Sequence, residues 1–390
     1  EACLRAFSIY FPGRVILMLP EELSNEICSL KPKKDKLTFS VLIDFKKNKI
    51  QSVWVGKAII QSDKRFTYAE VENTINKKVG LYTKEIIELN NLASHLKMNR
   101  IKNGSINFNR SDIKFKLNDN NEPESVTKSP TLKSQSLVEE FMLLANKIIA
   151  NKLSEQKSIY RIHDLPDSEK IKDLTFYLNN QRIQKKSISK KNLSLFINEL
   201  LSKEHKNLNK SIIENLILRA MAKAKYSTKN IGHYGLGFSV YTHFTSPIRR
   251  YSDLIVHRLL DAHIHKKNCD LLDLEKKCIY FSSVERTYID IERKLNRFVQ
   301  LKLLEKSVSQ TFKGYISGIT NWGIYVELEE GRGEGLVSTN SMVGDKFYYN
   351  DSKHTLTGRK SGKKFTLGQE LIVQIKSINL VKKQMDLEII

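Results

Sequence analysis

Cysteine is scarce in this chain: there are four in 390 residues, and no two of them form a C-x-x-C pair. They are Cys3, Cys28, Cys269 and Cys278. This spacing indicates neither a zinc site nor a disulfide framework, and it favours a reducing cytoplasm. Long apolar runs are also missing, since none approaches the roughly 18 residues of a membrane span. No secretory h-region opens the chain. We therefore expect no membrane partner and a cytoplasmic location.

Acidic residues are too few to balance the basic ones. The chain has 65 Lys and Arg against 43 Asp and Glu, a net charge of +22 and a pI of about 9.6. Such a surplus favours a polyanionic partner, and without a membrane segment that partner is nucleic acid. An AT-rich genome, which inflates Lys, Asn and Ile, is an alternative source for part of the charge. A basic protein of the membrane surface would need an amphipathic anchor, which the sequence does not offer.

Apolar patterns divide the first 308 residues into a mixed body of helices and strands, and 40% hydrophobic content is enough for two or more domains. Alternation predicts strands, and three-to-four spacing predicts helices. In the first half of this body we expect a hairpin of Leu37–Phe45 and Ile50–Ile60 joined by the turn KKNK, a helical stretch 68–103, a strand Ser105–Leu117 and a loop Asn118–Pro130. A helix Ser136–Leu153 follows, with Ser136 as its N-cap. Two basic-faced helices are predicted within Gln184–Lys225 and a long basic helix within 272–308.

The pattern changes at about residue 309. Short alternating strands separated by Gly and Asn turns follow in "TFKGYISGITNWGIYVELEEGRGEGLV" and in the closing "QELIVQIKSINLVKKQMDLEII". Five such strands within a short C-terminal stretch predict a small closed barrel of the OB type. The chain is thus predicted to be an α+β body followed by an all-β barrel.

Two adjacent arginines stand out in "YTHFTSPIRRYSDLIVHRLL" (Tyr241–Leu260). Ser246 and Pro247 predict a helix start, which places Arg249 and Arg250 in the first turn. Cations there cost about 0.3–1 kcal/mol each against the helix dipole. A bound phosphate would offset that cost, because a guanidinium fork matches its oxygens. The alternative is that the arginines pair with acidic residues from another segment.

This stretch also contains aromatic and histidine side chains that could have functional or structural roles. The aromatic residues Tyr241, Phe244 and Tyr251 either stack on bases or pack in the core. His243 and His257 are interpreted as structural. Asp253 and His257 are four residues apart, so we expect them to support one another on the helix face.

The segment "GHYGLGFSVYTHFTSPIRRYSDLIVHR" resembles the signature of the ribonuclease II/ribonuclease R (RNB) exoribonucleases, with Ser252 where relatives often carry Pro or Gly. "SIYFPGRVILMLPEELSNEICSLKP", "LVEEFMLLAN" and "YRIHDLP" are similar to further blocks of that family. The tail, including "GRKSGKKFTLG", resembles its carboxy-terminal domain. The resemblance implies an α+β RNB domain lacking its amino-terminal segment over 1–308, and an S-one-type OB-fold RNA-binding domain over 309–390.

The resemblance also implies a reaction. Family members hydrolyse single-stranded RNA processively from the 3′ end and release 5′-mononucleotides. Two Mg²⁺ ions activate a water and stabilise the leaving oxygen. Ribonuclease R relatives also degrade structured RNA. The expected partner is therefore the single-stranded 3′ end of RNA; a helicase or ribosome partner is left open.

Individual residues match the family's motifs. Arg249 resembles the arginine that holds the phosphate near the scissile bond. Tyr10 resembles the tyrosine that stacks on the terminal base, with Tyr68 as the alternative. Phe108 resembles the aromatic residue at the other end of the base stack. Stacking of this kind grips any sequence, because every base has a π-face.

Two glutamates match as well. Glu139 resembles a glutamate near the terminal nucleotide, and Glu292 resembles the acidic residue that hydrogen-bonds the terminal ribose or base, with Glu285 as the alternative. A carboxylate that binds hydroxyl groups favours ribose over deoxyribose. The remaining predicted substrate-binding residues are Arg250, Tyr241 and Lys313.

One family feature is missing. The family's metal site is a cluster of four aspartates upstream of the block that begins at Ser8, and no Asp-x-Asp-Asp cluster occurs in this sequence. We therefore expect no metal ligands in this chain, which would bind RNA without cutting it. The first residue is Glu1, and the chain reads as a piece of a longer protein that carries the aspartates. The alternative is a naturally non-catalytic RNA-binding relative.

The barrel carries its own candidates for RNA contact. Aromatic stacking is predicted for Phe312, Trp322, Tyr325 and the run Lys346–Tyr349, and phosphate contact for Lys313, Arg332, Arg359, Lys360, Lys363 and Lys364. We expect at least half of these aromatic residues to fill the barrel interior instead, with Trp322 and Tyr325 as candidates.

Overall fold

The computed structural model describes residues 1–108, 111–180, 192–203, 210–268, 272–342, 344–350 and 355–390. The chain forms two compact units, each assembled from three segments. The first unit contains Glu1–Ile106, Thr131–Asp164 and Lys223–Ile289, and the second contains Asn107–Pro130, Leu165–Ala222 and Asp290–Ile390. Among the helices in these ranges, none combines the length and apolar character that a membrane span requires.

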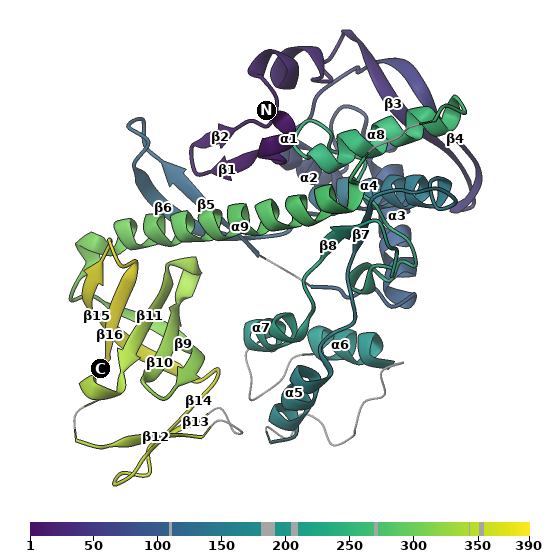
Figure 1. The fold of residues 1–390 in the computed structure, drawn as a ribbon. Helices are drawn as coiled ribbons and strands as arrows, with labels where there is room; N and C mark the ends of the chain where they lie inside the picture. The colour runs from purple at the N-terminus through teal and green to yellow at the C-terminus, as the bar shows by residue number, and fades with distance from the viewer. Residues whose placement is uncertain (109–110, 181–191, 204–209, 269–271, 343, 351–354) are drawn as a thin grey trace. The chain divides into compact units, whose positions relative to one another are not determined.

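The first unit is α+β and combines α-helices with the long hairpin β3–β4 (Figure 1). Its elements are α1 (Ala2–Arg5), β1 (Ile9–Phe11), β2 (Arg14–Ile16), the π-helix η1 (Glu22–Ile27), β3 (Asp35–Lys46), β4 (Lys49–Gln61), α2 (Tyr68–Lys77), α3 (Thr83–Lys102), α4 (Lys133–Lys152), β7 (Tyr160–Ile162), β8 (Lys225–Ser227), η3 (Tyr234–Leu236), α8 (Tyr251–Ile264) and the beginning of α9 (Leu274–Leu304).

Local sequence explains several of these boundaries. Lys47 and Asn48 both have positive φ, as a two-residue type I′ turn requires, so the predicted hairpin β3–β4 is confirmed. Thr67 and Glu70 form a reciprocal capping box at the start of α2: the Thr67 N–H donates to Glu70 Oε2 at 2.6 Å, and the Glu70 N–H donates to Thr67 Oγ1 at 3.2 Å.

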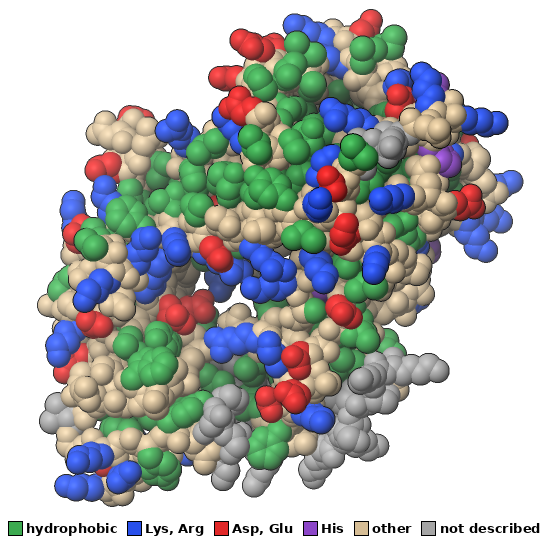
Figure 2. Space-filling view, viewed as in Figure 1, with side chains coloured by type: hydrophobic (Ala, Val, Ile, Leu, Met, Phe, Trp, Pro, Cys, Tyr) green, Lys and Arg blue, Asp and Glu red, His purple; other side chains and the backbone are tan. Residues whose placement is uncertain are grey.

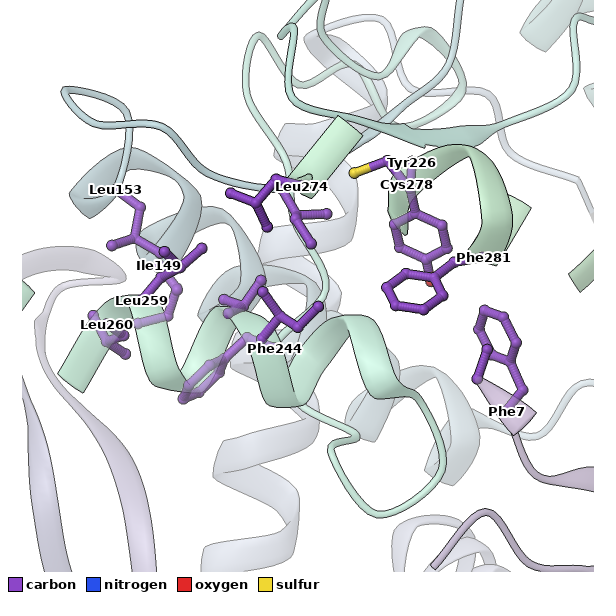
Figure 3. Packing of buried hydrophobic residues seen from close by; sticks show 14 residues of the cluster. Phe7, Ile149, Leu153, Tyr226, Phe244, Leu259, Leu260, Leu274, Cys278 and Phe281 are labelled. Carbon is purple, nitrogen blue, oxygen red and sulfur yellow. The ribbon is translucent and has the colours of Figure 1, made fainter. Parts of the chain in front are cut away.

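The core of the first unit joins segments far apart in the sequence (Figure 3). Its buried side chains come from α4, β8, α8, the first turns of α9 and connecting segments. They include Phe7, Ile149, Leu153, Tyr226, Phe244, Leu259, Leu260, Leu274, Cys278 and Phe281. Burial of each large apolar side chain stabilises the fold by about 1.5–3 kcal/mol. Phe244 shortly precedes the arginine motif in the sequence, and the residues on either side of Phe7, Ala6 and Ser8, bond to the backbone of the motif, so the core helps to fix that backbone.

The second unit contains a hairpin, three helices and a closed barrel. Its elements are β5 (Ser111–Leu117), β6 (Pro123–Pro130), α5 (Ser168–Asn180), α6 (Leu193–Ser202), α7 (Lys210–Ala220), the C-terminal part of α9, the 3₁₀ turns η4 (Glu305–Ser307), η5 (Glu329–Gly331) and η6 (Thr339–Ser341), and the strands β9 (Thr311–Thr320), β10 (Gly323–Leu328), β11 (Gly333–Ser338), β12 (Phe347–Asn350), β13 (Thr355–Gly358), β14 (Lys364–Thr366), β15 (Glu370–Asn379) and β16 (Gln384–Ile389).

The barrel confirms the prediction for the C-terminal domain (Figure 1). Its strands close in the order β10-β11-β16-β15-β9, with β11 and β16 parallel and the other neighbours antiparallel. Aliphatic side chains fill the interior, namely Ile316, Ile324, Val326, Val337, Val373, Ile375 and Leu387. A separate sheet, β12-β13-β14, accompanies the barrel.

The prediction that at least half of the barrel's candidate aromatics fill its interior is wrong. Trp322 is 54% exposed and Phe312 and Tyr325 are half-buried, as are Phe347 and Tyr349, while Tyr348 is exposed. The interior of a five-stranded barrel is small, and β-branched and leucine side chains fill it without space for larger rings. These aromatic side chains therefore remain on or near the surface.

Several element boundaries also differ from the predictions. The predicted loop Asn118–Pro130 contains β6, which pairs with β5, and the predicted strand Ser105–Leu117 starts only at Ser111. Pro123 and Pro130 did not prevent the strand because they are its first and last residues, where a missing N–H is tolerated. The predicted helical stretch 68–103 is two helices, separated at Lys78–Tyr82 by positive-φ residues.

The remaining predicted helices differ in how well they match the structure. Helix α4 starts at Lys133, so Ser136 is not its N-cap; Gln135 Oε1 instead accepts the Leu132 N–H at 2.8 Å. The predicted basic-faced helices correspond to α6 and α7, and the rest of Gln184–Lys225 lies partly outside the described residues, as does Cys269. The long helix predicted within 272–308 is confirmed as α9.

Candidate nucleic-acid interface

The arginine motif lies just before helix α8, not inside its first turn. Helix α8 begins at Tyr251, and Arg250 is its N-cap with an extended backbone (φ −136°, ψ 120°). The backbone there pairs with the N-terminal segment: the Ser8 N–H donates to the Arg249 carbonyl at 3.1 Å, and the Tyr251 N–H donates to the Ala6 carbonyl at 2.8 Å. A single turn does start at Ser246, whose carbonyl accepts the N–H groups of Arg249 and Arg250 at 3.2 and 3.0 Å. The prediction that this turn is the first turn of the helix is wrong, because the pairing with the N-terminal segment extends the backbone at Arg250 and α8 starts only after it.

Arg250 forms an ion pair within its own helix. Its Nη2 and Nε donate to the Asp253 carboxylate at 2.8 and 3.0 Å, and Asp253 is completely buried. The Ser246 N–H donates to the same carboxylate at 2.8 Å. The charge of Arg250 is thus balanced by Asp253, which lies in the same segment rather than in another one. Its predicted contact with substrate stays a prediction.

Arg249, in contrast, is exposed and lines a hollow of about 230 Å³. No carboxylate forms an ion pair with its guanidinium in the described part of the chain. The other lining residues are Tyr68, Gln135, Val138, Glu139, Met142, Leu143, Asn146, Tyr241, Thr245, Ser246 and Arg250. The fold thus brings together Arg249, Glu139, Tyr241 and Tyr68, four residues that the sequence singled out.

Asn146 of α4 fixes the loop that leads to Arg249. Its Oδ1 accepts the N–H groups of Phe244 and Thr245 at 2.9 and 3.2 Å, and its Nδ2 donates to the Tyr241 hydroxyl at 3.0 Å. Asn146 is 3% exposed, so these bonds form away from water. Together with Asp253, this side chain determines where the Arg249 backbone lies.

A buried aromatic and imidazole layer lies behind the hollow. Tyr241 packs edge-on against His233 and His243, at centroid distances of 5.4 and 5.6 Å. Burial lowers the pKa of His233 to about 3 and that of His243 well below its usual value, so both rings are neutral. Tyr241 is itself buried, which agrees with its packing interpretation, and its contact with substrate stays a prediction.

His257 does not bond to Asp253 as predicted. Its Nε2 lies 2.9 Å from the Phe244 carbonyl, and its ring stacks on Phe244 at 4.3 Å. Asp253 is already occupied by Arg250 and Ser246, so no hydrogen bond joins the two. The structural role predicted for His257 fits this buried stacking.

The segment GHYGLGF holds the chain that leads to Phe108. The Gly235 carbonyl accepts the Ile106 N–H at 3.0 Å and the Ser105 hydroxyl at 3.2 Å. Gly237 has φ +65°, and a Cβ there would lie 2.8 Å from the Ser105 nitrogen, so only glycine permits this approach. Behind this contact, Arg100 forms a buried ion pair with Glu140, with Nη2–Oε1 at 2.5 Å and Nε–Oε2 at 3.2 Å.

The other predicted residues are placed as follows. Tyr10 is half-exposed on β1, two residues from Ser8, which bonds to Arg249. It does not line the Arg249 hollow, whereas its alternative Tyr68 does. Phe108 and Glu292 are half-buried residues of the second unit, and Lys313 is exposed on β9 of the same unit.

Glu285, the alternative to Glu292, is part of an ion pair. It accepts hydrogen bonds from Arg161 at 2.6 and 3.1 Å, and the Arg161 guanidinium lies over the Tyr226 ring at 4.7 Å. The sequence analysis did not single out Asn146, Arg100 or Arg161. The Glu140, Glu285 and Phe244 partners of these residues lie 40 to 124 residues away along the chain, so no local pattern indicated these contacts.

The basic turn Gly358–Gly362 of the second unit is organised by one carboxylate. Asp345 accepts the N–H groups of Lys346, Lys360 and Ser361 at 2.7, 2.9 and 2.8 Å, and the Ser361 hydroxyl at 2.5 Å. These bonds hold the pKa of Asp345 well below its usual range.

Lys and Arg side chains are spread over the face of the molecule in Figure 2 rather than gathered in one patch.

A two-metal centre does not fit the described residues. Groups of three or more His, Cys, Asp or Glu side chains close enough to hold a metal ion do not occur among them. Glu139 is the single acidic side chain among the residues that line the Arg249 hollow. One carboxylate cannot provide the several oxygen ligands that a divalent ion such as Mg²⁺ requires.

Known families match the chain in two places. Residues 1–266 match the RNB domain, and residues 305–390 match the S1 RNA binding domain. The chain belongs to the RNB family. This confirms the resemblance and the predicted fold class of an RNB domain followed by an OB-fold barrel. The domain boundary predicted between residues 308 and 309 stays a prediction.

Relatives of this RNB protein include ribonuclease R of Aquifex aeolicus, which is 32% identical over 406 residues; the match covers all of this chain and 57% of that protein. The chain thus spans just over half the length of such relatives. The structure "Mycoplasma genitalium RNase R in complex with ribose methylated single-stranded RNA" matches with a TM-score of 0.93 and 30% identity, over all of this chain and 63% of that one. The double-stranded RNA complex of the same enzyme matches with a TM-score of 0.85 and 27% identity, covering 66% of that chain.

Proposed function

We propose that this RNB chain is the RNA-gripping part of a processive 3′-to-5′ exoribonuclease that releases 5′-mononucleotides from single-stranded RNA. The observation that carries the proposal is the separation of roles in the arginine motif. Arg250 is neutralised by Asp253, whereas Arg249 faces an open hollow without an acidic ion-pair partner in the described residues. A guanidinium in that position fits a backbone phosphate.

Each part of the chain then has a binding role. Arg249 holds a phosphate near the scissile bond, while Tyr10 and Phe108 stack on bases at the two ends of the gripped tail. Glu139 lies near the terminal nucleotide, and Glu292 hydrogen-bonds the ribose or base of that nucleotide. The barrel, with Lys313 and exposed Trp322, adds contacts that do not depend on sequence. Structured RNA is a further proposed substrate, in line with the double-stranded RNA complex of the M. genitalium relative.

Mg²⁺ is the proposed cofactor of the hydrolysis, and its ligands would be residues other than those described here. Two divalent ions would supply an activated water and stabilise the leaving oxygen. What this chain contributes is the grip and orientation of the RNA. A non-catalytic RNA-binding protein is the second candidate, because the described residues lack an acidic cage. We also propose a cytoplasmic location.

The test of binding uses the 390-residue chain and fluorescent oligo(A). We expect Arg249→Ala to weaken binding about 5- to 30-fold, and to reduce the slope of log K against log salt by about 0.7 for one lost phosphate contact. Arg258→Ala is the matched control, because Arg258 is an exposed arginine of α8 outside the hollow. Equal affinity of the Arg249 and Arg258 variants would rule out phosphate binding by Arg249.

The test of activity uses the whole protein from which the chain derives. Labelled oligo(A) is incubated with Mg²⁺ or with EDTA, and the products are separated by size. Mononucleotide release that stops in EDTA supports the exoribonuclease. Binding without any release selects the non-catalytic candidate, and release that persists in EDTA contradicts the metal mechanism.

A further inference from the structure

A second hollow of about 640 Å³ lies in the first unit beside the Arg249 hollow. The N-terminal ends of α2, α3 and α4 and the strand-to-helix segment before α2 surround it. Tyr68 and Val138 line both hollows, so the two adjoin. Its lining residues are Asp63, Lys64, Arg65, Phe66, Thr67, Tyr68, Val71, Tyr82, Glu85, Ile86, Leu89, Ser134, Leu137 and Val138. We name it the aromatic hollow.

Its walls are apolar and aromatic. Phe66 and Tyr82 meet edge to face at a centroid distance of 6.1 Å, and Tyr82 remains 44% exposed. Tyr82 also has φ +56°, which a bulky side chain rarely adopts, so the surrounding fold holds the ring in place. The volume and the lining match those of sites for small organic ligands, which are roughly 300–1,000 Å³ and mostly apolar with few polar groups.

The polar groups indicate what kind of ligand fits. Lys64 and Arg65 place two cations in the lining, and Lys64 Nζ lies 4.7 Å from the centre of the Phe66 ring. Asp63 is neutralised by Lys33 at 2.9 Å, which leaves Glu85 as the other acidic residue of the lining.

We propose that the aromatic hollow is a nucleobase subsite that adjoins the phosphate site at Arg249. The base contacts the rings of Phe66 and Tyr82, and the cations of Lys64 and Arg65 attract the phosphate backbone. A ring-lined site accepts any base, because stacking needs only a π-face. The proposal rests on the RNA-binding function proposed above, and it adds a place for a base that the sequence motifs did not assign.

The experiment measures binding of adenosine 5′-monophosphate to the 390-residue chain. We expect Phe66→Leu, which keeps the apolar volume but removes the ring, to weaken this binding about tenfold. Leu89→Trp, at a half-exposed position of the lining, fills the hollow and should abolish binding. Trp54→Leu is the control, because Trp54 is an exposed aromatic residue on β4 outside the hollow. Thermal unfolding of each variant shows whether it is folded, and Leu89→Trp tests the site if Phe66→Leu is unstable.

Photolabelling with 8-azido-adenosine monophosphate locates the bound base. Labelled peptides within 63–89 or 134–138 support the subsite, whereas labels elsewhere overturn it. Oligo(A) binding separates the two proposals. If the chain binds oligo(A) but the Phe66 and Leu89 variants bind the mononucleotide as the Trp54 control does, the subsite is wrong and the RNA-binding function stands. If the chain does not bind oligo(A), both fall.

Discussion

Replacement of Asn146 by alanine tests whether one buried amide holds the Arg249 loop. The Phe244 N–H would lose its acceptor in a buried setting, which costs about 1–3 kcal/mol. The hydrogen bond to the Tyr241 hydroxyl contributes about 1 kcal/mol more, whereas the half-buried Thr245 N–H can bond to water. We therefore expect Asn146→Ala to lower the free energy of unfolding of the first unit by about 2–4 kcal/mol.

The two tryptophans of the chain make this measurement specific. Trp54 belongs to the first unit and Trp322 to the second, so in a Trp322→Phe background the fluorescence during urea unfolding reports the first unit alone. Asn151→Ala is the control, because Asn151 is an exposed asparagine at the end of the same helix.

Binding gives a second readout of the same change. A loosened loop no longer orients Arg249, so Asn146→Ala should also weaken oligo(A) binding while Asn151→Ala does not. If the two alanine variants unfold within about 0.5 kcal/mol of each other, the hydrogen bonds of Asn146 do not hold the loop, and the account of the hollow given above is refuted.

Two further predictions concern charge. Arg250→Ala strands the buried Asp253 carboxylate and should cost about 3–5 kcal/mol of unfolding free energy; a loss no greater than that of Arg258→Ala contradicts the pairing. Burial lowers the pKa of His233 and His243, so below the unfolded pKa of about 6.5 only the unfolded chain takes up these protons. The free energy of unfolding should thus fall from pH 7 toward 5, by about 1.4 kcal/mol per pH unit for each histidine. His233→Gln should reduce this pH dependence by the contribution of one histidine. An unchanged pH dependence would exclude His233 as a contributor.

Elements that are determined by residues close together in the sequence could be predicted from it. The hairpin β3–β4, helix α9 and the five-stranded barrel all follow from alternation, periodicity and turn residues within a few positions of each other. Strand β6 could not, since its pairing with β5 outweighs a segment rich in Asn, Ser and Pro. The start of α8 was also missed, because Arg249 and Tyr251 bond to the N-terminal segment more than 240 residues away in sequence.

In the candidate site, too, only residues within a local motif or at a short spacing could be predicted from the sequence. The motif identified Arg249 and Glu139, and the fold brings both to one hollow. The different roles of Arg249 and Arg250 depend on Asp253, whose three-residue spacing from Arg250 was a usable signal of an ion pair. Asn146 had no such signal, because its partners are 95 to 99 residues distant and only the packed structure places them together.

Asp345 determines which groups of the basic turn in the second unit are available to contact an RNA strand. Its carboxylate already saturates the backbone amides of Lys346, Lys360 and Ser361, which would otherwise be a fixed cradle for a phosphate. A passing strand therefore meets only the flexible ends of the lysine and arginine side chains of this turn. Such contacts are weak, quickly renewed and readily displaced by salt. A surface of this kind lets a polynucleotide slide while it is still held, which suits the processive exoribonuclease proposed for this chain.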